Sequence, residues 1–260
     1  MRDLIIAVPL WAIMVALLLL FSAVIFTARR IVRRRCADDT CEEIAEQANG
    51  LATGLAATFA FFVGFAITVT WGAVSTGQAA VEQQAASIQQ MAWGLNNIAN
   101  RTESAALMEK LRTYATTAAT DDDAFLVRGD TANLPSAVPL DRFEDALHIY
   151  AFGSTAAVQE VNSLVTRAGA LGTNAAMVSA VAQRSLPGVL GILLVVAGVL
   201  VAAVVGFTTV TARRPALMYV WALIPARSIT VVVALAFPFA HRIGVSTAPL
   251  QAVAENLATR

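Results

Sequence analysis

The chain has 260 residues, of which 57% are hydrophobic, with a mean hydropathy of +0.66 and no formal net charge. An ordinary soluble domain is less apolar than this, and a neutral chain has no overall field that attracts nucleic acid. We therefore expect a membrane protein whose partner is the lipid bilayer, and we exclude nucleic-acid binding.

Four apolar stretches organise the chain, at residues 4–26, 51–74, 186–210 and 216–240. The first three contain no charged residue, and the fourth contains only Arg227. A helix of about 20 residues crosses the hydrocarbon core, and its backbone groups are satisfied within the segment. The stretches predict an all-α integral membrane protein with four transmembrane helices.

Arginines in the two short connections set the expected orientation. The turn 27–50 contains Arg29, Arg30, Arg33, Arg34 and Arg35, and the connection between the last two spans contains Arg213 and Arg214. Positive residues in short loops stay in the cytoplasm. We expect a multi-pass protein of the plasma (inner) membrane with both termini and residues 75–185 outside the cytoplasm.

These spans predict three parts: a first helix pair in 1–74, an extramembrane stalk in 75–185, and a second pair in 186–260 with a short C-terminal tail. In the stalk, the second span is expected to continue as a helix through Asn100. Residues 120–139 contain an acidic run, a glycine and two prolines, which predict a solvated loop at the far tip.

An apolar stripe marks the first stalk helix, because Val81, Ile88 and Leu95 recur every seven residues. Such a stripe must be covered. It predicts either a stalk interface, with a second copy or a partner, or packing within the chain against a returning helix through Val158 and Val165.

We find no pattern typical of an enzyme, a cofactor site or a metal site. Phosphate-loop, nucleophile-elbow and zinc-protease motifs are absent from the sequence. His148 is expected to be a packing residue. Cys36 and Cys41 are expected to be reduced thiols on the cytoplasmic side, whereas a disulfide becomes plausible if the orientation is inverted.

Phenylalanines crowd the second span at positions 59, 61, 62 and 65. Phe61 and Phe65 are one turn apart and share a face. When several copies surround an axis, such rings can constrict a pore. Contact with lipid or packing in a protein core is the alternative explanation.

Glycines in the second and third spans allow helices to approach closely. The candidate packing positions are Gly50, Gly54, Gly64, Gly191, Gly198 and Gly206. This pattern is general among helical membrane bundles and does not indicate one function.

Arg227 is the most informative single residue, because it lies near the middle of the fourth span. A charge there costs about 2.5–3.5 kcal/mol, so the side chain should face protein, water or an anion. The alternative is an arginine that snorkels to the inner interface. Pro225 cannot donate to the helical ladder and is expected to bend the helix.

The fourth span ends with Pro238-Phe239, followed by Val245-Ser246 and Pro249-Leu250, and the second opens with the sequence from Glu46 to Gly54. With two helices, a long helical connection containing Leu111-x-x-Tyr114, and two more helices, the chain resembles the bestrophin-like bacterial membrane proteins of unassigned function. The resemblance spans roughly residues 45–250.

This resemblance implies kinship with bestrophins, which form pentameric anion channels with aromatic constrictions on the second helix. Phe61 and Phe65 match by position and spacing. Bestrophins keep the region between helices two and three in the cytoplasm, whereas the arginine turns here predict the reverse. The leading hypothesis is an oligomeric anion pore formed by Phe61, Phe65 and Arg227. The alternative is a non-conducting scaffold or accessory subunit that docks a partner through its stalk.

Overall fold

The structure is a computed structural model that describes residues 8–35, 38–153, 158–184, 188–210, 218–240 and 244–259. All regular secondary structure in these residues is helical, which confirms the predicted fold class. The chain forms two compact units. Unit 1 comprises Met1–Trp71 and Ser185–Ala236, and unit 2 comprises Gly72–Arg184 and Phe237–Arg260.

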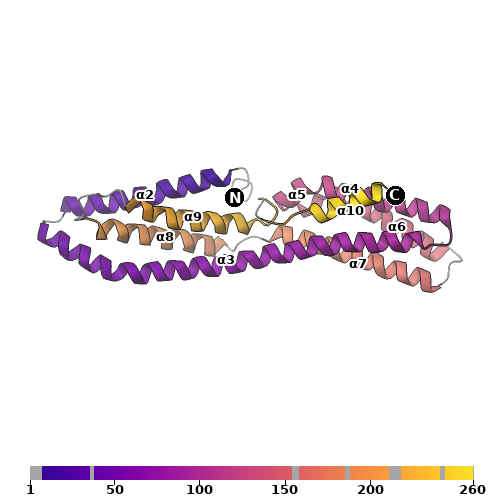
Figure 1. The fold of residues 1–260 in the computed structure, drawn as a ribbon, viewed down its shortest axis with the longest axis horizontal. Coiled ribbons are helices and arrows are strands. Elements are labelled where there is room, and N and C mark those ends of the chain that lie inside the picture. Colours follow the sequence, from indigo (N-terminus) through magenta and orange to yellow (C-terminus); the bar gives the residue numbers. More distant parts are fainter. Residues whose placement is uncertain are drawn as a thin grey trace. The chain divides into compact units, whose positions relative to one another are not determined.

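Unit 1 contains the apolar helices (Figure 1). These are α2 (Leu10–Arg35), the first part of α3 (Asp38–Asn96), α8 (Gly188–Thr208) and α9 (Met218–Ala236). Four helical segments of the described chain, which together include these helices, are long and apolar enough to cross a membrane. Their number agrees with the four spans expected from the sequence. The expected turn 27–50 is instead helical on both sides, because α2 continues to Arg35 and α3 begins at Asp38.

The core of unit 1 forms where α2 packs against α8 and α9. Phe21 is completely buried and lies against Gly198, where an added Cβ would be 2.9 Å from the Phe21 ring. At Gly206 an added Cβ would be 2.8 Å from the Ile25 carbonyl oxygen. Glycine at these two positions lets α8 approach α2 closely.

Unit 2 contains the remaining helices together with the second part of α3. They are α4 (Arg101–Thr120), α5 (Asp123–Arg128), the 3₁₀ turn η1 (Thr131–Asn133), α6 (Ala137–Gly153), α7 (Val158–Gln183) and α10 (Ala248–Ala258). Helix α3 ends at Asn96 rather than Asn100. Asn100 instead caps α4, because its side-chain oxygen accepts bonds from the amides of Thr102 and Glu103.

The apolar stripe of α3 lies inside the core of unit 2. Val81, Ile88 and Leu95 are each 0% exposed, packed in one cluster with residues of α4, α6, α7 and α10. Helix α7 also bonds to α3, since the Arg167 guanidinium donates to the Gln90 carbonyl over 2.7 Å. The stripe is therefore covered by this chain itself.

The face of α7 that covers α3 differs from the one expected. Val158 is 75% exposed and Val165 is 47% exposed, whereas Leu164 and Leu171 are buried. Both sets of residues recur at helical spacing, so the sequence alone did not distinguish them. The larger leucine side chains fill the core.

Residues 120–139 are not the solvated loop that their composition predicts. They form α5 and η1, which pack against α7. Asp122 is 5% exposed, and its carboxylate accepts bonds from the amide and the hydroxyl of Ser136. This pairing supplies the donors that a buried carboxylate needs.

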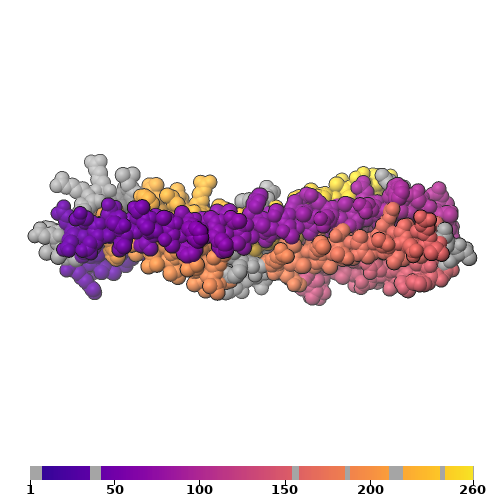
Figure 2. Space-filling model, turned by 90° about the horizontal axis from the view of Figure 1, so that it is seen from below, coloured from indigo at the N-terminus to yellow at the C-terminus, as the bar shows by residue number. Residues whose placement is uncertain are grey.

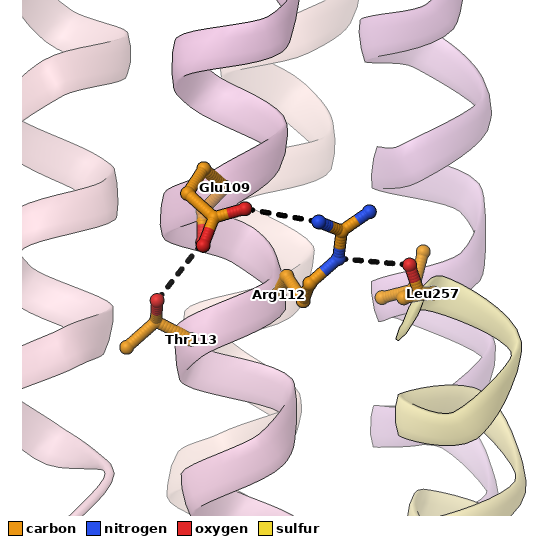
Figure 3. A network of polar contacts seen from close by, with 4 residues as sticks. All are labelled: Glu109, Arg112, Thr113 and Leu257. Carbon is orange, nitrogen blue, oxygen red and sulfur yellow. Dashed lines mark hydrogen bonds and ion pairs between the residues drawn. The ribbon is translucent and has the colours of Figure 1, made fainter. Parts of the chain in front are cut away.

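The C-terminal helix α10 belongs to unit 2 and packs against α4. Arg112 on α4 joins the two helices (Figure 3). Its Nε donates to the Leu257 carbonyl over 2.8 Å, and its Nη1 lies 3.0 Å from the Glu109 carboxylate. A carbonyl near the end of α10, which has no partner within its own helix, is satisfied in this way.

Candidate pore-lining face

One face of α3 in unit 1 is not covered by the other residues that the structure describes. The opposite face packs into the core through Phe59, Val63 and Ala66. The centre of the uncovered face, which we call the α3 outer face, consists of exposed residues recurring every three or four positions: Gly50, Gly54, Ala57, Thr58, Phe61, Gly64, Phe65 and Thr68. The exposed apolar residues Leu51, Val69 and Trp71 flank it. In Figure 2, α3 lies along the visible surface.

The composition of the α3 outer face differs from that of an ordinary lipid-facing surface. Helix α8 provides the comparison, because its exposed side chains are large and aliphatic, as at Val189, Ile192 and Leu200. The α3 outer face contains glycine, alanine, threonine and two phenylalanines instead. Glycine, alanine and threonine are typical of surfaces where membrane helices meet closely.

Three glycines of this face pack against no other described residue of the chain. An added Cβ at Gly50, Gly54 or Gly64 would meet nothing within 4 Å. By contrast, Gly198 and Gly206 contact α2 directly. If Gly50, Gly54 and Gly64 serve close contacts, those contacts involve another molecule.

The hydroxyl groups of the face are already bonded within the helix. Thr58 donates to the Gly54 carbonyl and Thr68 donates to the Gly64 carbonyl, each over 2.9 Å. Such bonds to the preceding turn let threonine lie at membrane depth without another partner. Their oxygens keep acceptor capacity for water.

The four phenylalanines of the second span point in different directions. Phe61 is 69% exposed and Phe65 is 52% exposed, whereas Phe59 is buried in the core. The rings of Phe61 and Phe62 meet edge to face, with centroids 5.9 Å apart. The structure therefore places on the outer face the two rings that the sequence selected.

Arg227 lies in the middle of α9 on its exposed side, together with Val220, Leu223 and Val231. It does not enter the core of unit 1. Pro225 lies inside the helix and is buried. The structure thus brings Phe61 and Phe65 to one surface, and it places Arg227 on a different helix of the same unit.

The remaining predicted residues fall into three groups. Val81, Ile88 and Leu95 have no exposed area with which to form a stalk interface. Cys36, Arg213, Arg214 and His241 lie outside the described residues. His148, which was expected to be a packing residue, is instead exposed on α6, where its ring centroid is 4.4 Å from that of Phe152.

Sequence reasoning missed two sets of residues. The first is Thr58 and Thr68 of the outer face, which a search for small residues at helical spacing would have found. The second is a buried polar group in unit 2, formed by Gln84, Tyr114 and Asp122. No local sequence pattern indicates that group, because its members are far apart along the chain.

The apolar helices and their topology define an all-helical membrane protein. Residues 6–250 match the model of the Bestrophin-like domain, and the chain belongs to the Bestrophin-like family. This finding confirms the resemblance seen in the sequence.

Solved structures share the fold. A crystal structure of a bacterial bestrophin homologue from Klebsiella pneumoniae has a TM-score of 0.70 at 14% identity, with 94% of this chain and 97% of that chain covered. A point variant of a Klebsiella pneumoniae homologue also gives 0.70 at 14% identity, with 94% and 99% covered. A structure described as a membrane protein gives 0.68 at 13% identity, with 94% and 97% covered. No curated protein sequence matches the chain.

Proposed function

We propose that this protein is an oligomeric anion channel in which the α3 outer faces of several copies surround the pore. The observation that carries the proposal is the composition of that face, where two exposed phenylalanines lie among glycine, alanine and threonine. In a ring of copies, Phe61 and Phe65 form the narrowest part of the path, which gates by dewetting. The kinship with bestrophins supports the same arrangement.

Arg227 supplies the positive charge of the anion path in this proposal. An arginine at membrane depth needs a counter-charge, water or a polar partner. The four spans contain no aspartate or glutamate. A permeating anion and the water around it satisfy the guanidinium, and the exposed position of Arg227 leaves it accessible to both.

The alternative function is a scaffold that docks a partner through its stalk. The apolar stripe was the sequence feature that favoured it. The stripe is buried within unit 2, so it offers no surface to a partner. We therefore propose only the channel.

Anion flux from reconstituted liposomes tests the proposal. Phe61→Ala should raise the flux, because it widens the constriction, and Arg227→Gln should lower it. Arg227→Lys retains the charge and should preserve most of the flux. Leu200→Ala is the matched control, since Leu200 is a 51% exposed apolar residue on α8, away from the outer face.

Two results would contradict the channel. One is purified protein that releases no anion from liposomes. The other is flux that responds to Leu200→Ala as strongly as to Phe61→Ala, because the constriction then does not lie on the outer face.

We further propose that both termini and unit 2 lie outside the cytoplasm, with the arginines at the C-terminal end of α2 inside. An impermeant maleimide on intact cells tests this orientation. A cysteine introduced at the exposed Ala132 should react, whereas the native Cys41 should be protected. Ser136 is unsuitable as a probe position, since it is buried against Asp122. Labelling of Cys41 and protection of the cysteine at position 132 would instead place unit 2 in the cytoplasm, the side on which bestrophins keep the region between helices two and three.

A further inference from the structure

Unit 2 contains a cavity of about 210 Å³ that the proposed channel function does not use. Residues of α3, α4, α5, α6, α7 and α10 line it. Two of the lining residues, Ala137 and Ala176, are exposed, so the cavity opens to solvent. It is far larger than the 10–15 Å³ that one water needs, and smaller than a typical pocket for a drug-sized ligand. Its size suits a small molecule.

Two buried acceptor groups line this cavity with unused bonding capacity. Gln84 is 4% exposed, and its amide nitrogen donates to the Tyr114 hydroxyl over 2.7 Å. Its carbonyl oxygen Oε1 is buried and has no hydrogen-bond partner among the described residues. Asp122 accepts two bonds from Ser136, which leaves about two of its lone-pair positions free. A buried polar atom without a partner is costly and calls for an explanation.

The charge around the cavity is negative. Asp122 lines it, and no lysine, arginine or histidine is among the residues that form its wall. Burial raises the pKa of Tyr114, and the nearby carboxylates of Asp122 and Glu144 raise it further against the opposing bond from Gln84. The field favours a cation over an anion.

The rest of the wall is apolar. Leu126, Leu134, Leu140, Val178 and Leu250 surround the polar end with aliphatic surface. A bare metal ion does not suit this wall, and the described residues contain no group of three or more metal-binding side chains. A ligand with a cationic head and a short alkyl chain matches both the polar part and the apolar part of the cavity wall.

We propose that this cavity binds a short primary alkylamine in its protonated form. The ammonium head has three donors, and it bonds to Gln84 Oε1 and the Asp122 carboxylate. The alkyl chain lies against the leucine and valine side chains. Hydrogen bonds to a charged group are stronger than neutral ones, so head and chain both contribute to affinity.

Calorimetric titration of the full-length protein in detergent tests this site with butylammonium as the probe. 1-Butanol is the matched neutral compound, because it has the same chain without the charge. Butylammonium should bind with 1:1 stoichiometry per chain, and butanol should bind at least about tenfold more weakly. Affinity should also fall as the pH is lowered and Asp122 becomes protonated.

Three variants and one control locate the binding. Gln84→Met and Asp122→Asn should each weaken butylammonium binding about tenfold or more. Ala176→Leu narrows the cavity opening without removing a polar group, so it should weaken binding even if the other variants destabilise unit 2. Ser87→Ala removes a buried hydroxyl from α3 outside the cavity wall, and it should leave binding unchanged.

Several results would overturn the proposal. One is the absence of binding heat with butylammonium when the wild-type protein is folded. Equal affinity for butylammonium and butanol would show an apolar pocket without recognition of charge. Binding that survives both Asp122→Asn and Ala176→Leu would place the amine elsewhere and leave the cavity to water.

Discussion

The long helix α3 is covered to different extents in the two units of this protein. In unit 2, the apolar stripe of α3 is completely covered, and Val81, Ile88 and Leu95 have no exposed area. In unit 1, the same helix exposes Phe61 and Phe65 at membrane depth. The stalk part of α3 is thus covered by its own chain, whereas the membrane part leaves large apolar side chains exposed.

The glycines show the same difference. Gly77 of unit 2 lies so close to its neighbours that an added Cβ would be 2.6 Å from a Val245 methyl group. Gly54 and Gly64 of unit 1 face open space. In the proposed channel, these two glycines are positions where other copies make contact. The following changes test this difference, from the largest expected effect to the smallest.

The first change is Ile88→Glu in the core of unit 2. Ile88 is 0% exposed, and a buried carboxylate without a partner should cost more than about 4 kcal/mol of the free energy of unfolding. We expect loss of cooperative unfolding in a thermal scan. Gln89→Glu is the matched control, because it adds the same charge at the neighbouring exposed position and should change little.

If Ile88→Glu instead leaves the chain folded and alters only the particle mass in detergent, the stripe is an interface between molecules. That outcome would mean that the stalk part of α3, like the membrane part, is not fully covered by its own chain.

The four spans could be predicted from the sequence because lipid permits only a few solutions for an apolar segment. The all-α class and the heptad stripe of α3 followed from the same kind of local pattern. The helical register of α7 could not be predicted, since Val158 and Val165 recur at the same spacing as Leu164 and Leu171. Only the volume available in the core decides between two such faces.

The burial of Asp122 also could not be predicted from the sequence. A run of three acids is normally solvated, and its burial here depends on Ser136, which follows 14 positions later. The exposed positions of Phe61 and Phe65 agree with the predicted face. Their contribution to conduction stays a prediction, because it depends on copies of the chain around an axis.

The second change compares Gly206→Ala with Gly64→Ala, both in unit 1. The new Cβ at position 206 would lie 2.8 Å from backbone and side-chain atoms of α2, so the helices must separate. We expect a loss of about 1–3 kcal/mol of stability. At position 64 the new Cβ meets nothing within the chain. Gly64→Ala should therefore preserve stability and weaken assembly, measured as particle mass during dilution in detergent.

The assembly explanation of the outer face fails if Gly64→Ala and Gly54→Ala together change neither particle mass nor anion flux. The face would then be a lipid-facing surface that happens to contain small residues.

The smallest expected effect concerns the pH dependence of unit 2. Burial raises the pKa of Asp122 above its ordinary value of 3.8, although two bonds from Ser136 oppose the shift. A carboxyl with a raised pKa in the folded state stabilises the fold most below its unfolded pKa, and this contribution is lost as the pH rises through the folded value. The unfolding temperature of the wild type, relative to Asp122→Asn, should therefore fall as the pH increases from about 4. Asp123→Asn, at an exposed position of the same acidic run, should follow the wild-type profile. If Asp122→Asn also follows it, the carboxylate is better solvated than its burial indicates.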